Sequence, residues 1–582
     1  MRKLTFILAT AFSILVAADA CAQQDSSLAG LWYAKRWFGP DVKGDLIIQR
    51  NGTSWRASIA SREADVRVSH DSVSFDVPNA AQFKGHIVRN GAAIVGQWID
   101  RNRRMAMPVT LTSCGAGCYS ARVQPIEDTF TFYMNVRPRA NGTLGAFLRN
   151  PERNQGRFIR LDHLVRKGDT VWFRDARDTT ITRGLLNNSG QLSAYLRFNT
   201  YDFEKLPADT FTYFYPRGRP TGSYSYTVPR AKNDGWTVGR ARDVGLSEDR
   251  LAAMVRKLIN SSVDSTNAFR PHGILIARHG KLVLEEYFLG EHADKPHDTR
   301  SASKTVATVT LGAAMLKGMN VSADMPVYST MGLTSPSLDP RKRNMKLWHL
   351  LTMSSGLDCD DGADEYHEGS EDNLTNQDTI PDWLSVVTRL KLIRDPGAKG
   401  IYCSINPYFA GEVISKATRK SFPDLVWELV GEPLKMERYT VGLDPMGRSY
   451  MGGGLKFRPR DFLKMAQVYA NGGTWNGKRI VSEEWVRESS KPRYFMASPQ
   501  FDNEWLAKAD LNYGYLWWST LYKYKGKIIR AYQMSGNGGQ YNMFIPDLDL
   551  VIGVWGGNYA DRGGFFAITD LVPKDILTAI EK

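Results

Sequence analysis

Ser301 and Lys304 are the two side chains in this sequence whose spacing points most directly to covalent chemistry. They lie in Ser301-Ala-Ser-Lys304, at the start of a helix predicted over 301–316, and no other serine is followed by lysine three residues later. Residues three apart share a helix face, so the Lys304 ammonium can reach the Ser301 hydroxyl. A serine hydroxyl is a weak nucleophile that needs a neighbouring base, and a lysine with a lowered pKa can be one. The spacing predicts a nucleophilic serine, although the same motif also occurs on ordinary solvated helices.

Two later segments carry further polar groups in a fixed order. Tyr402-Cys-Ser404 precedes a predicted helix over 407–418, and Met534-Ser-Gly-Asn537 leads into a predicted strand. Together with Ser301 and Lys304, these segments make residues 235–582 resemble the serine hydrolases related to class C β-lactamases and penicillin-recognising enzymes. Further blocks match in the same order: His349–Leu357, Gly452–Asp461, Gly472–Ile480 and Tyr513–Trp518.

The resemblance implies a catalytic arrangement at the junction of a sheet and a helical insertion. It implies that Ser301 is the acylating nucleophile and Lys304 its base or proton shuttle. Tyr402 would protonate the leaving group and activate the deacylating water, with a pKa lowered by the neighbouring ammonium. The backbone N–H groups of Ser301 and Asn537 would form the oxyanion hole. No cofactor and no metal is expected.

Two positions depart from the family pattern, and they bear on the substrate. The family often has asparagine where this chain has Ser404, and lysine or histidine where it has Met534. We expect Ser404, Met534, Ser535 and Gly536 to contact substrate. Because Met534 carries no charge to hold a carboxylate, the sequence favours uncharged small-molecule or peptide-like esters and amides. A β-lactamase or a D-amino-acid peptidase is the first alternative.

The remaining hydrolase elements give an α+β order. Ser247 is a good N-cap for a helix whose apolar face includes Leu251 and Leu258. A hairpin follows over 273–285, strands are predicted around 527–530, 541–545 and 550–555, and a helix over about 567–580 closes the sequence. The fold class expected is a β-lactamase/transpeptidase-like domain, with an antiparallel sheet flanked by helices and a helical insertion.

The preceding part of the chain is predicted to be all-β. Short alternating runs from about residue 28 to 217 are separated by the hairpin signals Asn51-Gly52, Asn90-Gly91 and Asn141-Gly142. The domains expected are a β-rich accessory region over 23–217, with two similar barrel-like modules as one arrangement, a linker over 218–240 and the hydrolase over 241–582. The accessory region either supports folding and substrate presentation or contacts cell wall or lipid.

Residues 1–22 are predicted to be a secretory signal peptide. Arg2 and Lys3 precede an apolar run, and Ala20-Cys-Ala22 offers a cleavage site. We therefore expect an exported protein, periplasmic or secreted; a lipoprotein anchored through Cys21 is the alternative. No later stretch is long enough to cross a membrane.

Export gives the four remaining cysteines a structural meaning. Four cysteines allow three pairings. Cys114 and Cys118 flank a short glycine-containing loop that could close on itself, which would leave Cys359 to pair with Cys403 and clamp the Tyr402 segment. Four free thiols are the alternative.

Composition excludes several broad classes. The chain has 582 residues, 42% apolar and 23% charged, as in ordinary globular proteins. Its net charge of +14 is scattered rather than gathered in a basic block, so nucleic-acid binding is not expected. The absence of Gly-x-Ser-x-Gly and His-Glu-x-x-His disfavours an α/β-hydrolase and a zinc protease. A non-catalytic cell-wall or lipid sensor is the remaining rival from another class.

Overall fold

The structure is a computed structural model that describes residues 26–152, 160–196, 199–263, 268–376, 379–497, 506–559 and 562–581. The predicted signal peptide and Cys21 lie outside these residues. The chain forms two compact units, and each is described by itself. The first comprises Met1–Ala34, Tyr133–Leu148 and Phe158–Thr210; the second comprises Lys35–Phe132, Arg149–Arg157 and Phe211–Lys582.

The first unit is built on a closed antiparallel barrel. Alternation along its strands places one face inside, as in β13, where Val171 and Phe173 are buried. The order around the barrel is β1 (Gly30–Trp37), β10 (Thr129–Pro138), β11 (Leu144–Arg149), β12 (Arg160–Lys167), β13 (Thr170–Arg174), β14 (Thr180–Leu186), β15 (Leu192–Leu196) and β16 (Asn199–Lys205).

The first part of the second unit along the chain forms a second ring of strands. Strand β9 pairs with both β2 and β8, which closes the ring. Its strands are β2 (Gly44–Asn51), β3 (Ser54–Ile59), β4 (Arg62–Ser69), β5 (Ser72–Val77), β6 (Ala81–Val88), β7 (Ala93–Asp100), β8 (Met105–Gly115) and β9 (Cys118–Val123). The predicted turns are confirmed: Asn51-Gly52 joins β2 to β3, and Asn90-Gly91 joins β6 to β7.

This ring is joined by backbone pairing to the C-terminal part of the second unit, Phe211–Lys582. Strand β8 pairs with β21 (Tyr439–Gly442), which pairs in turn with β22 (Lys456–Phe457) and, through it, reaches β20 (His297–Asp298). Gln97 of β7 also donates to Asp424 at 3.0 Å. The sequence alone did not indicate this connection, because short strands far apart in the chain leave no local signal.

A nine-stranded sheet forms the centre of the C-terminal part. Its order is β17 (Thr237–Val238), β19 (Lys281–Tyr287), β18 (Pro271–Arg278), β30 (Leu550–Gly556), β29 (Gln540–Ile545), β28 (Lys527–Gly536), β27 (Trp518–Tyr524), β26 (Leu506–Tyr513) and β25 (Tyr494–Ala497). The predicted hairpin is confirmed by the antiparallel pairing of β18 with β19. A separate short hairpin consists of β23 (Thr474–Trp475) and β24 (Lys478–Arg479).

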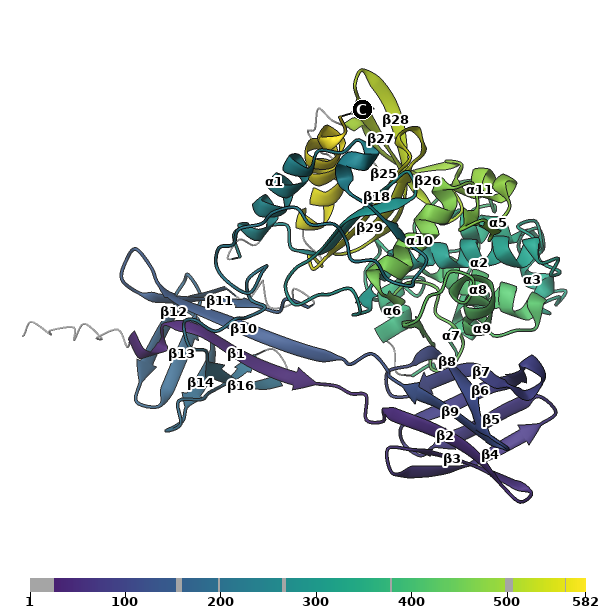
Figure 1. Ribbon diagram of the computed structural model, residues 1–582, viewed down its shortest axis with the longest axis horizontal. Helices are drawn as coiled ribbons and strands as arrows, with labels where there is room; N and C mark the ends of the chain where they lie inside the picture. The colour runs from purple at the N-terminus through teal and green to yellow at the C-terminus, as the bar shows by residue number, and fades with distance from the viewer. Residues whose placement is uncertain are drawn as a thin grey trace, which may run out of the picture. The chain divides into compact units, whose positions relative to one another are not determined.

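Helices cover both faces of this sheet. Helix α1 (Glu248–Ile259), capped by Ser247 as predicted, packs with the closing helical segments η8 (Ala567–Ile576) and η9 (Leu577–Ala579) on one face (Figure 1). Helix α10 (Pro459–Ala470) lies against β29 and β30 on the other face. The other helices are α2 (Thr305–Leu316), α3 (Val327–Thr330), α4 (Pro340–Arg343), α5 (Leu347–Leu351), α6 (Glu371–Asn376), α7 (Trp383–Arg389), α8 (Ile405–Thr418), α9 (Phe422–Val426) and α11 (Glu483–Ser490).

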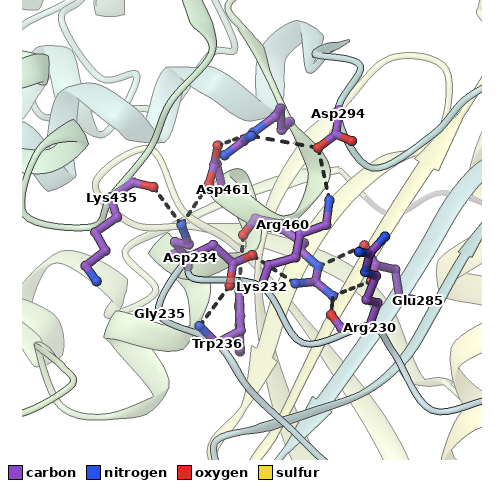
Figure 2. Close-up of polar contacts among 12 residues, drawn as sticks. Arg230, Lys232, Asp234, Gly235, Trp236, Glu285, Asp294, Lys435, Arg460 and Asp461 are labelled. Atoms are coloured by element: carbon purple, nitrogen blue, oxygen red, sulfur yellow. Dashed lines mark hydrogen bonds and ion pairs between the residues drawn. The ribbon is translucent and has the colours of Figure 1, made fainter.

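The segment predicted as a linker is packed against α10 and β19 by a buried polar network. Figure 2 shows the Arg460 side chain between Asp234 and Glu285, with both carboxylates as partners. Arg460 is 2% exposed, and Nη2 also donates to the carbonyl oxygen of Arg230 at 2.6 Å. Trp236 is buried and donates to the Arg460 carbonyl oxygen at 3.1 Å. A buried arginine needs such partners to offset its desolvation, so these residues fix the segment rather than leave it free.

No helix within the described ranges is long and apolar enough to cross a membrane.

Candidate active site

Ser301 lies on the short helical turn η4 (Arg300–Lys304), which leads into α2. Lys304 Nζ donates a hydrogen bond to Ser301 Oγ at 2.8 Å and another to the carbonyl oxygen of Gly452. Lys304 is completely buried. The expected i, i+3 contact is therefore present, and the lysine has no solvent to compete for its ammonium.

The residue before Ser301 has an unusual backbone conformation. Arg300 has φ of 49°, in the left-handed region that non-glycine residues rarely adopt. Its N–H donates to Asp298 Oδ1 at 2.9 Å, and its carbonyl oxygen accepts from the N–H of Gly454 at 3.2 Å. These two hydrogen bonds hold Arg300 in its strained left-handed conformation. Strained backbone of this kind is common at active sites, where it positions catalytic side chains.

Tyr402 lies directly beside this pair. Lys304 Nζ is 5.0 Å from the centroid of the Tyr402 ring, and Lys304 and Ser301 both act to lower the pKa of the phenol. The same ring packs against Trp518, with centroids 5.4 Å apart, and edge-on against Tyr513 at 6.0 Å. The structure thus brings Ser301, Lys304 and Tyr402 together although about a hundred residues separate them in sequence.

The end of β28 forms the other side of the site. A Cβ at Gly536 would lie 2.5 Å from the Thr299 carbonyl oxygen and 3.0 Å from the Ala302 nitrogen, so only glycine permits this approach. A cavity of about 370 Å³ opens here, lined by Ser301, Tyr402 and residues 535–539 among others. Ser301 and Asn537, the two predicted oxyanion-hole residues, both line it.

Two predicted substrate contacts are corrected by the structure. Ser404 is completely buried, and its N–H and hydroxyl both donate to the Asp361 carboxylate, the hydroxyl at 2.6 Å. Met534 is also completely buried, where its Sδ accepts from Asn542 Nδ2 at 3.4 Å. Neither side chain lines the cavity, whereas Ser535 and Gly536 do. Met534 points away because alternate residues of a strand face opposite sides of the sheet.

Two carboxylates near Lys304 were missed by the sequence reasoning. Asp361 is bound to Ser404, and its N–H donates to the Tyr402 carbonyl oxygen at 3.0 Å. Glu371 accepts from the Tyr450 hydroxyl at 2.5 Å. Both lie in an acidic stretch after Leu357, and nothing local separates them from its exposed members.

The charges around Lys304 and Tyr402 favour the fully protonated pair. Burial alone lowers the pKa of Lys304, but Tyr402, Glu371 and Asp361 outweigh it and raise that pKa above its ordinary value. Burial also raises the pKa of Tyr402, despite Lys304 and the hydrogen bond to Ser301. The expectation of a lowered tyrosine pKa is therefore wrong for the free protein, because desolvation of the phenolate exceeds the attraction of the ammonium.

The structure joins Cys114 to Cys118 and Cys359 to Cys403. The second disulfide ties the residue before Ser404 to the residue two before Asp361. It reinforces the hydrogen bonds between these same two segments and so helps to fix Tyr402.

We predict that the Cys359–Cys403 disulfide stabilises the protein. Because it closes a loop of 44 residues, the Cys359→Ala/Cys403→Ala double variant should lower the free energy of unfolding by about 2–4 kcal/mol. Urea unfolding of both proteins measures this, and the Cys114→Ala/Cys118→Ala variant, which opens a loop of only four residues, is the matched control. Non-reduced peptide mapping that finds Cys359 and Cys403 as free thiols would contradict the assignment.

Comparison with known proteins identifies the family. A family model described as Beta-lactamase matches residues 264–556. The chain belongs to the beta-lactamase family. The resemblance inferred from the motifs and the expected fold are confirmed.

Three proteins similar to this beta-lactamase-family chain share low sequence identity with it. A 6-aminohexanoate-dimer hydrolase of Paenarthrobacter ureafaciens is 24% identical over 254 residues, which are 42% of this chain and 63% of that protein. The chain thus matches less than two thirds of that relative's length. A family VIII carboxylesterase structure is 16% identical with a TM-score of 0.41, covering 60% of this chain and 98% of that one. A penicillin-binding protein homologue from Pyrococcus abyssi is 18% identical with a TM-score of 0.41, covering 56% and 76%.

No group of histidine, cysteine, aspartate and glutamate within the described part of this family member is arranged to hold a metal ion.

Proposed function

We propose that the protein is an exported hydrolase that cleaves uncharged esters or amides through an acyl-enzyme on Ser301. The observation that carries the proposal is the 2.8 Å contact between Lys304 Nζ and Ser301 Oγ, at the mouth of a cavity that Tyr402 also lines. The name of one relative, a 6-aminohexanoate-dimer hydrolase, supports a hydrolytic reaction. Export is part of the proposal and rests on residues 1–22.

In the proposed mechanism, the Lys304–Tyr402 pair first loses one proton. The deprotonated pair takes the proton of the Ser301 hydroxyl as Ser301 Oγ attacks the substrate carbonyl carbon. The backbone N–H groups of Ser301 and Asn537 stabilise the oxyanion. Tyr402 then gives a proton to the leaving group, and in the second half it accepts one from the water that attacks the acyl-enzyme.

The carboxylates of Asp361 and Glu371 influence the first step, in which the Lys304–Tyr402 pair loses a proton. Asp361 and Glu371 stabilise the ammonium form of Lys304, so they raise the pH at which the pair loses its proton. Tyr450, which donates to Glu371, carries no charge of its own because burial raises its pKa well above the ordinary value. The proposal therefore includes an activity that increases with pH.

The Asp361→Asn variant tests this tuning. Asparagine keeps an acceptor for the Ser404 hydroxyl but removes a negative charge, so the pair should lose its proton more readily. We expect the acidic limb of the kcat/KM–pH profile to move about one pH unit lower. Asp360→Asn, at the exposed neighbouring carboxylate, is the matched control, and an Asp361→Asn profile that coincides with it would contradict the tuning role.

The function is tested with a panel of chromogenic substrates and the purified mature protein. p-Nitrophenyl acetate and butyrate and the matching anilides should be hydrolysed, whereas a chromogenic cephalosporin with a free carboxylate should be turned over far more slowly. Absence of all turnover, together with no covalent labelling by a fluorophosphonate, would favour a non-catalytic binding protein. A cephalosporin hydrolysed faster than the esters would favour a β-lactamase.

A further inference from the structure

The cavity beside Ser301 has apolar walls and no charged lining side chain among the residues that the structure describes. Trp518, Tyr541, Phe565 and Ile568 supply aromatic and aliphatic surface, and glycine backbone supplies much of the rest. A carboxylate or ammonium placed among these walls would lose hydration without an opposite charge on any lining side chain, which is unfavourable. The walls therefore suit an uncharged and mainly apolar group.

Strand β28 contributes two polar side chains to this cavity. Its alternation directs Gln533 and Ser535 to the cavity, while Met534 faces the opposite side and is buried there. Gln533 of β28 lies opposite Trp518 of β27 in the sheet, so its amide is next to the Trp518 side chain. The sequence motif around Met534 gave no reason to single out Gln533.

The Gln533 amide is only half satisfied. The side chain is 1% exposed, and Nε2 donates to Thr520 Oγ1 at 3.2 Å. Its carbonyl oxygen Oε1 has no hydrogen-bond partner among the described residues, and neither has the hydroxyl of Ser535. Buried acceptors in native proteins are nearly always paired, so an unpaired one on a residue that lines a cavity is positioned to accept from a bound molecule.

We propose that this cavity takes an uncharged, mainly apolar group of the substrate that carries one N–H or O–H, and that Gln533 Oε1 accepts a hydrogen bond from it. The inference rests on the proposed hydrolase function and adds the substrate class. Because Oε1 is the amide atom without a partner, the amide offers an acceptor to a donor of the substrate. The Ser535 hydroxyl can donate or accept a hydrogen bond, so it can pair with either kind of polar group on the substrate.

Matched p-nitrophenyl esters test the proposal on the acyl side. Four acyl chains of equal length are compared: an all-carbon chain, one with a secondary amide, one with the same amide N-methylated, and one ending in a carboxylate. A second series places the same four groups in the alcohol part of acetate esters, which distinguishes an acyl-group pocket from a leaving-group pocket. In one series, kcat/KM for the secondary amide should exceed that for the N-methyl amide about tenfold, as expected for one neutral hydrogen bond.

Variants of Gln533 show whether this side chain is responsible. Gln533→Met has similar size and no acceptor, so the ratio of secondary to N-methyl amide should fall to about one. Gln533→Asn keeps an uncharged amide acceptor and should keep a ratio above one. Thermal midpoints and fluorophosphonate labelling confirm that each variant is folded with a reactive Ser301.

Three results would overturn the inference: equal rates for secondary and N-methyl amides in both series, a ratio that survives in Gln533→Met, or a carboxylate-terminated chain that is preferred. If these occur while hydrolysis still depends on Ser301, only the substrate class is wrong. If no ester is hydrolysed in a Ser301-dependent manner, the proposed function itself fails.

Discussion

Replacing Ser301 with alanine is expected to lower kcat for ester hydrolysis by about 10⁴–10⁶-fold, the usual cost of removing a catalytic nucleophile. Without the Oγ atom no acyl-enzyme can form, and Lys304 loses the partner that it contacts at 2.8 Å. The fold should be retained, because the change removes one oxygen at the edge of an open cavity. Hydrolysis of p-nitrophenyl butyrate, followed against the wild-type protein, measures the loss.

The result needs a control for contaminating esterases and for general damage. Ser335→Ala changes an exposed serine between α3 and α4 and should leave the rate unaltered. A fluorophosphonate should add one adduct to the wild type and to Ser335→Ala, as measured by intact mass, and none to Ser301→Ala. Retained labelling in Ser301→Ala would assign the nucleophile to another residue and end the proposed mechanism.

Replacing Tyr402 with phenylalanine is expected to lower kcat by about 10²–10⁴-fold, the range of general acid–base catalysis. The ring contacts with Trp518 and Tyr513 stay in place, so the loss should come from the hydroxyl and its proton. If Tyr402 also activates the deacylating water, the variant should release a burst of p-nitrophenol and accumulate acyl-enzyme.

A neighbouring tyrosine provides the matched control for this variant. Tyr513→Phe removes a hydroxyl from the ring that packs edge-on against Tyr402, at 1% exposure, without touching Ser301. It should change kcat only a few-fold. A Tyr402→Phe variant that behaves like Tyr513→Phe would leave Lys304 as the sole proton carrier.

Elements with a strong local signal could be predicted from the sequence. Ser247 with the apolar face of α1, the hairpin turn between β18 and β19, and the Asn51-Gly52 turn each depend on a few neighbouring residues. Connections between distant segments could not be predicted from the sequence. The pairing of β8 with β21 and the burial of Trp236 against Arg460 depend on contacts across hundreds of residues.

The candidate site divides in the same way. The contact of Ser301 with Lys304 follows from helical spacing, which the sequence contains by itself. The positions of Ser404 and Met534 do not, because the motif gives residue order but not the direction of a side chain. The Ser404 hydroxyl donates a hydrogen bond to Asp361, and strand alternation directs the Met534 side chain away from the cavity.

The sequence by itself determined the beta-lactamase-type motif, the i, i+3 reach of Lys304 to Ser301, and the helices and hairpins whose signals are local. The tertiary structure decided which side chains line the cavity, that Asp361 and Glu371 influence Lys304, and that Gln533 leaves an acceptor unpaired. The physical reason is the separation in sequence between the groups that interact. Hydrogen bonding within a turn depends on adjacent residues, whereas burial, and the pKa and hydrogen-bond needs that follow from it, depend on everything that packs around a group.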